Sequence, residues 1–322
     1  MNILIVKLSS LGDVVHAMPA VQDIRAAVPH ANVDWVVERG FAPLVQRCEG
    51  VRRAIPLELR RWRKSPLSPA TRHGWREFRE ALHAQAYDAV LDLQGLTKSA
   101  LVARTARMAE GGKRYALANQ TEGSSYEAPT RWLADVAVPV PSRSHAVQRS
   151  RDLCAMSLGY AMPAPLRWGL RAQPVREGDR PCIAFVHGTS RDDKCWPRQH
   201  WARMGRRLVE EGFAIALPHG SDAEQRRSAE LAEAIGSHAF VWPRLDLGAL
   251  TDRLAGCAGV IGVDSGLSHI AVALGLPHVQ VYNFDTAWRT GPIGDGPHRS
   301  VYGSPCPSPE AVWEAWQAVR PR

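Results

Sequence analysis

The sequence predicts an α/β protein with two doubly wound, Rossmann-like domains that face a central cleft. Short apolar segments alternate with helical patterns in both halves of the 322-residue chain, which is typical of parallel sheets covered by helices. Prolines cluster between the two halves, as expected for a linker. Doubly wound domains bind ligands at the carboxyl ends of their strands, so two facing sheets are expected to enclose one binding cleft.

Residues 1–160 are predicted to form the N-terminal domain. An apolar strand spans residues 3–7, and a helix follows from about Asp13 with apolar side chains at helical spacing. The alternation of strands and helices then continues. Its predicted members are strand 33–37, helix 75–86, strand 87–93 and a helix over 145–158.

Residues 179–322 are predicted to form the C-terminal domain, after a proline-rich linker over about 161–178. The last helix, about residues 308–319, could pack back on the N-terminal domain. The other helices lie between strands, the first of them beginning at a proline, which suits a first helical turn. The predicted strands are 183–186, 214–217, 240–242, 260–263 and 278–281.

The chain carries a net charge of +8 and has a pI of about 9.5, which favours an anionic partner. Anionic lipid and phosphorylated substrates fit this charge. Nucleic acid is not expected, because no nucleic-acid-binding fold accompanies the basic residues. No apolar run approaches the roughly 20 residues of a membrane span, and the N-terminus does not resemble a signal peptide. We therefore expect a cytoplasmic protein.

The six cysteines are scattered without C-x-x-C spacing, and no H-x-x-x-H pair is present. The cysteines are expected to be free thiols in a reducing compartment, and no metal site is expected.

The first candidate site follows the first strand and contains Ser9, Ser10, Gly12 and Asp13. The loop joins a strand to a helix, where α/β domains place ligands. The Asp13 carboxylate could cap the helix by accepting backbone N–H bonds. It could equally be a general base among polar substrate contacts. The two interpretations compete in part, because a carboxylate bonded to N–H groups has a lowered pKa.

The second candidate site is the strand-to-helix turn with Asp264, Ser265, Gly266, Leu267 and His269. A helix N-terminus offers free N–H groups to an anion, and a glycine lets a phosphate approach the backbone. The pattern suits a diphosphate, although an ordinary helix cap would also explain it. Ser268 and His269 are adjacent, so they are not interpreted as part of a hydrolase triad.

Two further segments carry groups that bind anions. Thr189, Ser190 and Lys194 follow a strand and suit phosphate oxygens. The neighbouring acidic pair is expected to form ion pairs with the flanking cations rather than bind Mg²⁺. The second segment is a basic run around a tryptophan, which could be a solvated face, an anion grip or a membrane contact. Its cations are Arg60, Arg61, Arg63 and Lys64.

Together these segments resemble the lipopolysaccharide heptosyltransferases, most closely the heptosyltransferase I members. The order and spacing of the motifs carry the resemblance, and the run over residues 60–64 is its most specific element. Other shared segments are residues 34–38, 78–82, 87–90, 94–96 and 191–194.

The resemblance implies a GT-B fold with the acceptor on the N-terminal domain and the donor on the C-terminal domain. It implies inverting transfer of L-glycero-D-manno-heptose from ADP-heptose to the first Kdo of Kdo2-lipid A, peripherally on the cytoplasmic face of the inner membrane. Asp13 would be the general base, and no cofactor or metal is expected. Residues matching donor contacts are Thr189, Ser190, Lys194, Glu224, Leu245, Asp264, Ser265, Gly266, Leu267 and His269. Those assigned to the acceptor are Ser9, Ser10, Gly12, Arg60, Arg61, Arg63, Lys64 and Gln94.

Two segments depart from the family pattern. An Arg-Glu-Pro stretch is expected near the acceptor, but residues 122–125 read Glu-Gly-Ser-Ser. A Gly-Pro-Thr turn is expected after the last strand, but Asn283 and Phe284 follow Tyr282. Two other functions stay open: a later-acting heptosyltransferase or related transferase with another acceptor, and a non-catalytic protein that binds a nucleotide sugar or anionic lipid.

Overall fold

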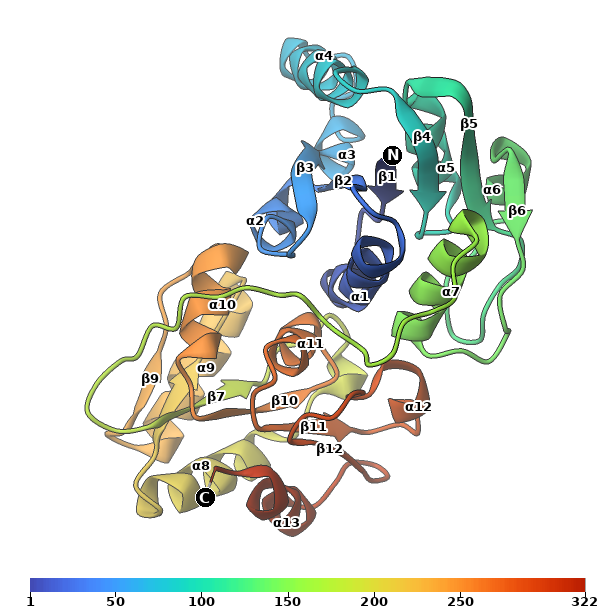
Figure 1. The fold of residues 1–322 in the computed structure, drawn as a ribbon. Helices are drawn as coiled ribbons and strands as arrows, with labels where there is room; N and C mark the ends of the chain where they lie inside the picture. The colour runs from blue at the N-terminus through green and yellow to red at the C-terminus, as the bar shows by residue number, and fades with distance from the viewer. Residues whose placement is uncertain (322) are drawn as a thin grey trace. The chain divides into compact units, whose positions relative to one another are not determined.

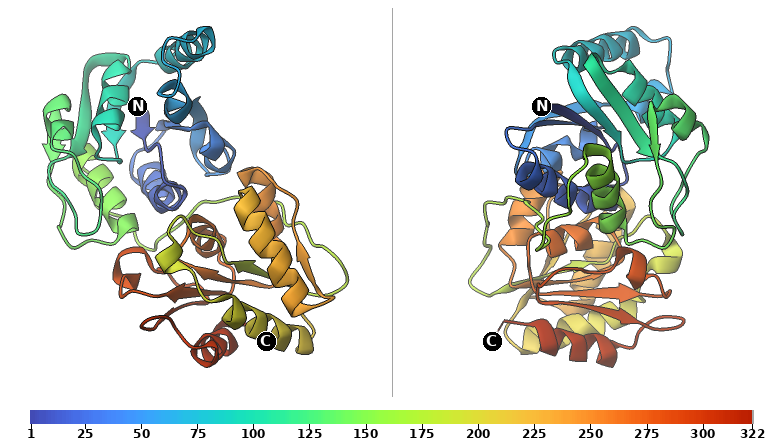
Figure 2. Two further views of the ribbon diagram at one scale, coloured as in Figure 1. Left: turned by 180° about the vertical axis from the view of Figure 1, so that it is seen from behind. Right: turned by 45° about the vertical axis from the view of Figure 1, so that its right-hand side comes forward.

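The computed structural model describes residues 1–321 and contains two compact units, Met1–Leu170 and Arg171–Arg322. Each unit is built on one six-stranded parallel sheet with helices on both faces (Figure 1; Figure 2). The division between the units falls inside residues 161–178, the stretch predicted as a linker. Within the described residues, no helix is both long and apolar enough to cross a bilayer.

The first sheet has the strand order β3-β2-β1-β4-β5-β6. Its strands are β1 (Asn2–Val6), β2 (Asn32–Glu38), β3 (Val51–Leu57), β4 (Tyr87–Asp92), β5 (Met108–Leu117) and β6 (Val136–Val138). Its helices are α1 (Leu11–Ala27), η1 (Arg39–Phe41), α2 (Ala42–Val45), α3 (Leu59–Trp62), α4 (Pro69–His83), α5 (Thr97–Thr105), α6 (Pro129–Leu133) and α7 (Ala146–Leu158).

The central strand β1 is apolar along most of its length because both of its faces are covered. Its four residues from Ile3 to Val6 are fully buried, as expected of an inner parallel strand. Leu4 and Val6 pack in a cluster with Phe78 of α4 and Val102 of α5. Helices α1 and α7 pack against each other (Figure 1).

The second sheet has the strand order β12-β11-β10-β7-β8-β9. Its strands are β7 (Cys182–Val186), β8 (Ala214–Leu217), β9 (Ala239–Val241), β10 (Gly259–Val263), β11 (His278–Tyr282) and β12 (His298–Tyr302). Its helices are η2 (Asp192–Lys194), α8 (Arg198–Glu210), α9 (Asp222–Ile235), α10 (Leu247–Ala255), α11 (Gly266–Ala273), α12 (Ala287–Thr290) and α13 (Pro309–Val319).

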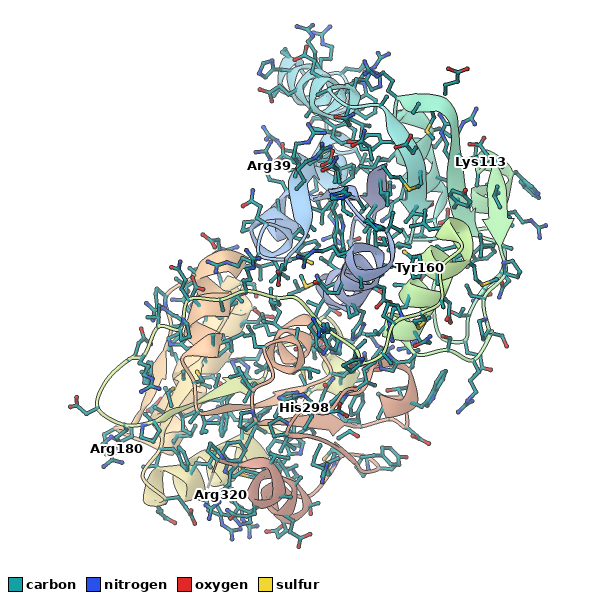
Figure 3. The ribbon with its side chains drawn as sticks, viewed as in Figure 1. Arg39, Lys113, Tyr160, Arg180, His298 and Arg320 are labelled. Atoms are coloured by element: carbon teal, nitrogen blue, oxygen red, sulfur yellow. The ribbon has the colours of Figure 1, made fainter. Side chains whose placement is uncertain are left out.

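The last helix, α13, packs inside the second unit. Its Trp313 and Trp316 belong to the same buried cluster as Phe185 of β7 and Trp201 of α8. Just after α13, Arg320 pairs with Glu211 at the end of α8 (Arg320 is labelled in Figure 3). The sequence allowed for this helix to pack back on the N-terminal domain. Within the second unit, the two tryptophans bury their rings in the core, and packing on the N-terminal domain stays a prediction.

Each sheet reverses its strand order once. In the first unit the reversal lies between β1 and β4, and in the second between β7 and β10. At such a point the two connections leave toward opposite faces and open a crevice at the carboxyl ends of the strands. The predicted site loops at Asp13 and Asp264 begin at these strand ends.

Candidate functional site

Asp13 occupies the third position of α1 and accepts two hydrogen bonds from Ser10. The Ser10 backbone N–H lies 3.1 Å from Asp13 Oδ2, and the Ser10 hydroxyl lies 2.8 Å from the same oxygen. This is one half of a capping box, so the helix-cap interpretation of Asp13 is confirmed. The other carboxylate oxygen, Oδ1, faces two cations instead, and the side chain keeps 34% of its surface exposed. Capping therefore leaves Asp13 reachable by a substrate.

Lys7 and Arg149 are the two cations at Asp13. Lys7 Nζ lies 3.7 Å and an Arg149 terminal nitrogen 3.6 Å from Asp13 Oδ1. Burial by itself raises the pKa of Asp13, but Lys7, the Ser10 hydrogen bonds and Arg149 outweigh it and lower this pKa to about 2. Asp13 is thus ionised at neutral pH.

Lys7 was not among the site residues predicted from the sequence. Its side chain is almost fully buried, and Nζ donates to the Leu93 carbonyl at 3.0 Å. Burial lowers the Lys7 pKa, although Asp13 and Asp92 oppose that shift. Burial also raises the pKa of Asp92, at the end of β4, to about 6. A lysine that ends an otherwise apolar, buried strand is a signal that could have revealed this residue.

Arg149 was missed as well. It comes from α7, 136 positions after Asp13, so no local motif links the two residues. Its other terminal nitrogen donates to the buried Thr121 hydroxyl at 3.0 Å. Thr121 directly precedes residues 122–125, the segment that departs from the family pattern, and it is linked to the surroundings of Asp13 through Arg149.

Gln94 and Ser9 shape the loop before α1. Gln94 Oε1 accepts from the backbone N–H groups of Leu8 and Ser9, both at 3.1 Å. Ser9 is buried, whereas Gly12 lies partly exposed in the first turn of α1. Among the predicted acceptor residues, Gln94 holds the loop that carries Ser10 and Asp13.

The basic run surrounds the short helix α3. Trp62 is buried and packs edge-on against Trp75 and beside Phe78, which anchors the segment. Glu58 lies 3.2 Å from Arg61 and 3.4 Å from Arg39, which Figure 3 labels. The four predicted cations are all exposed: Arg60, Arg61, Arg63 and Lys64.

In the second unit, Asp264 is the centre of a polar cluster at the end of β10. Lys194 Nζ lies 2.5 Å from Asp264 Oδ2. His269 Nε2, 3.5 Å away, approaches the other oxygen, Oδ1. Burial raises the Asp264 pKa, but His269 and Lys194 outweigh it, so the pKa lies well below the ordinary value. Asp264 therefore keeps its negative charge, and Lys194 is held at the start of α11.

Ser265, Gly266 and Leu267 form the start of α11 next to this cluster. Ser265 is at the N-cap position, yet its side chain makes no capping hydrogen bond. The buried Ser265 hydroxyl has no hydrogen-bond partner among residues 1–321. An ordinary serine cap would bond to the first turn, so this geometry favours the anion-binding interpretation of the turn.

Glu224 lies at the start of α9 and touches the loop after β7. One carboxylate oxygen accepts from the Gly220 backbone N–H at 2.6 Å. A Cβ added to Gly188 would approach the other oxygen to 2.9 Å, so the glycine permits this close contact. His187 bonds to the Ser228 hydroxyl at 2.8 Å, and burial lowers the His187 pKa to about 4, which leaves the ring neutral at pH 7.

The remaining predicted donor residues lie on the same unit. The Thr189 hydroxyl is 3.4 Å from the Asp264 carbonyl, and Ser190 is exposed on the loop. Leu245 is partly buried just before α10. Asp193 forms an ion pair with Arg191, as expected of this acidic stretch. Within residues 1–321, no three His, Cys, Asp or Glu side chains gather in a way that could hold a metal ion.

Comparison with known proteins gives consistent matches. A family model for glycosyltransferase family 9 (heptosyltransferase) matches residues 75–306. Lipopolysaccharide heptosyltransferase 1 of Escherichia coli K12 is 40% identical over 289 residues, which cover 88% of each chain. Lipopolysaccharide heptosyltransferase 2 of the same strain is 26% identical over 315 residues, covering 91% of this chain and 86% of the relative.

The solved structure of E. coli heptosyltransferase WaaC with ADP superimposes with a TM-score of 0.87. It is 35% identical and is matched over 98% of each chain. The two parallel six-stranded sheets and this match confirm the predicted GT-B fold class.

Proposed function

Because the chain belongs to glycosyltransferase family 9 (heptosyltransferase), we propose that it transfers L-glycero-D-manno-heptose from ADP-heptose to the first Kdo of Kdo2-lipid A, with inversion, during synthesis of the lipopolysaccharide inner core. The observation that carries the proposal is that one chain contains two loops whose chemistry suits the two halves of this reaction. One presents an ionised, partly exposed carboxylate, Asp13, and the other presents Lys194 beside the free N-terminus of α11. A base and an anion site are what this transfer requires.

The donor is proposed to bind the second unit through its diphosphate. Lys194 and the N–H groups that open α11 offer positive charge to phosphate oxygens. The unbonded Ser265 hydroxyl offers a further donor. Glu224 suits the hydroxyls of the nucleoside. The remaining residues assigned to the donor are Thr189, Ser190, Leu245, Gly266, Leu267 and His269.

In the proposed reaction Asp13 accepts the proton of the acceptor hydroxyl as its oxygen bonds to the anomeric carbon. The bond from that carbon to the phosphate oxygen breaks, and ADP leaves with the electron pair. The anomeric centre gains oxocarbenium character, so the hydroxyl becomes acidic late in the reaction. An ionised carboxylate with a pKa of about 2 is always ready to accept this proton.

The charge that develops on ADP is proposed to be stabilised by the protein itself. Lys194 and α11 would supply fixed positive charge at the leaving group. We therefore propose that the reaction needs neither a metal ion nor another cofactor. Undiminished transfer in excess EDTA is the expected result, and activity that returns only with added Mg²⁺ would contradict it.

The acceptor is proposed to bind the first unit and to be reached at a membrane surface. Arg60, Arg61, Arg63 and Lys64 are exposed and suit the carboxylates and phosphates of the acceptor. Ser9, Ser10, Gly12 and Gln94 lie in or against the loop of Asp13. Leu67, 85% exposed, follows the basic run, and α4 adds a row of arginines. This composition suits an anionic leaflet and supports the proposal that the protein acts peripherally on the cytoplasmic face of the inner membrane.

A transfer assay with ADP-heptose and Kdo2-lipid A tests the proposal. Heptosylated product with inverted configuration is expected. Transfer only to an acceptor that already carries heptose would indicate the later-acting alternative, which the 26% identity to heptosyltransferase 2 makes the weaker of the two. Binding of ADP-heptose without turnover on either acceptor would indicate a binding protein.

A further inference from the structure

The segment between β11 and α12 contacts the loop that presents Lys194. Asn283 is the first residue after β11, and its Nδ2 lies 2.9 Å from the Asp193 carbonyl and 3.0 Å from the Cys195 carbonyl. These two carbonyls flank Lys194 directly. An amide NH₂ group has two donors and no acceptor, so two carbonyl partners fix which way the Asn283 amide points.

A second contact lies on the next residue of the same turn. The Phe284 ring, 42% exposed, has the Arg191 guanidinium 6.0 Å from its centroid. Arg191 in turn pairs with Asp193. The turn after β11 thus contacts the loop on the N-terminal side of Lys194 through Phe284, and on both sides through Asn283.

The flanks of this turn also hold the partner of Lys194. Gln280 Nε2, from β11, lies 3.4 Å from Asp264 Oδ1, and the Thr290 hydroxyl, from α12, lies 3.3 Å from the same oxygen. Lys194 occupies the other oxygen. Residues 280–290 therefore form hydrogen bonds both to the backbone on either side of Lys194 and to the Asp264 carboxylate that the Lys194 ammonium contacts.

We propose that Asn283 is a positioning residue for Lys194, which holds the Lys194 loop where its ammonium meets the donor diphosphate. The inference rests on the proposed binding of ADP-heptose by this unit. Without the Asn283 side chain, the carbonyls of Asp193 and Cys195 would lose these two hydrogen bonds. The Asn283 side chain therefore holds the Lys194 loop in place.

Binding of ADP and of adenosine to the full chain separates this role from a general structural one. Asn283→Leu keeps the size of the side chain and removes its donor. Because a hydrogen bond contributes about 1 kcal/mol and 1.4 kcal/mol is tenfold in affinity, we expect ADP to bind about fivefold to tenfold more weakly. Adenosine, which lacks phosphates, should bind as it does to the unchanged protein. Asp285→Ala, at an exposed position of the same turn, is the matched control and should leave both affinities unchanged.

A double-mutant cycle with Lys194→Met completes the test. If Asn283 acts through Lys194, Asn283→Leu should cost little further ADP affinity once the ammonium is gone. Unchanged ADP affinity in Asn283→Leu, an equal loss for adenosine and ADP, or the full loss in the Lys194→Met background would each overturn the inference. If the unchanged protein failed to bind ADP at all, the proposed function would be wrong instead.

Discussion

At the scale of single residues, Asp13 combines two tasks that the sequence made look like alternatives. One carboxylate oxygen bonds to Ser10 and fixes the first turn of α1, and the other faces Lys7 and Arg149. The division is possible because a carboxylate has two oxygens with several lone pairs. The two cations lower the Asp13 pKa. The carboxylate is therefore ionised at neutral pH but is a weak base.

Asp13→Asn separates the two tasks. The amide oxygen can still accept the Ser10 N–H, so α1 should keep its cap, but the side chain can no longer take a proton. We expect kcat to fall by about 10²- to 10⁴-fold, and the melting temperature at neutral pH to fall modestly, because Asn cannot form the ion pairs with Lys7 and Arg149. Steady-state kinetics and thermal unfolding of the same preparation provide the check. Retention of full transfer activity would remove Asp13 from the reaction.

Lys7→Met tests the cause of the low Asp13 pKa. Removing the buried charge should raise that pKa, so the acidic limb of the pH–kcat profile should move to higher pH. Arg149→Met should move it in the same direction, because Arg149 is the second cation at Oδ1. Profiles of folded variants whose acidic limbs coincide with that of the unchanged protein would contradict this account.

The same pKa makes a statement about stability. Folding lowers the Asp13 pKa from 3.8 to about 2, so the stabilisation from its ion pairs is fully present above about pH 4. It is lost as the pH falls through the folded value, near pH 2. Acid unfolding of Asp13→Asn, which has no such group, should therefore depend less steeply on pH between 4 and 2 than that of the unchanged protein.

At the scale of elements, the donor site depends on close packing between β10 and α11. A Cβ added to Gly262 would come within 2.3 Å of the Ser268 hydroxyl and 2.9 Å of Val186 Cβ. Ser268 itself bonds to the Val263 carbonyl at 2.6 Å, so it has little freedom to retreat. The start of α11 thus sits on a strand that tolerates no side chain at this point.

Gly262→Ala is expected to lower the free energy of unfolding by about 1–3 kcal/mol, the usual cost of overpacking, and to weaken ADP binding. Gly40→Ala is the matched control, because nothing lies within 4 Å of a Cβ added there. Denaturant unfolding and ADP titration of both variants measure the effect. Equal stability of the two variants would show that α11 can shift away from β10 freely.

At the scale of the whole molecule, helix α4 of the first unit presents a row of arginines on its exposed side. On α4, Arg72, Arg76 and Arg79 recur at the spacing of one helical face and are exposed, whereas Phe78 and Leu82 are buried. These arginines are separate from the cations assigned to the acceptor. They therefore allow binding to a membrane surface to be distinguished from binding of the acceptor sugar.

Replacing these three arginines with glutamine should reduce sedimentation with vesicles that contain anionic lipid. Because the attraction is electrostatic, added salt should release the unchanged protein from the same vesicles. The control replaces Arg198, Arg203 and Arg206 of α8, which removes equal charge from the second unit. Binding that ignores salt, or that falls equally in both variants, would argue against α4 as the contact surface.

The strands that could be predicted from the sequence are those with a strong local pattern of apolar residues. The inner strands β1, β4, β7, β10 and β11 were all predicted, because burial on both faces demands runs of apolar residues. The patterns did not predict β3, β5, β6 or β12. Strands β3, β5 and β12 are partly exposed and carry polar or charged residues, such as Arg52 and Lys113, so their apolar signal is diluted. Strand β6 is apolar but only three residues long.

The sequence by itself determined the α/β class, the two-part organisation and the loops that carry Asp13, Lys194 and Asp264, because strand periodicity and strand-to-helix turns are local patterns. Only the tertiary structure decided which side chains meet. Lys7 and Arg149 come together at Asp13, Asn283 fastens the backbone around Lys194, and α13 packs into the second core. The physical reason is that these contacts join residues from separate elements, whose meeting depends on sheet order and helix packing.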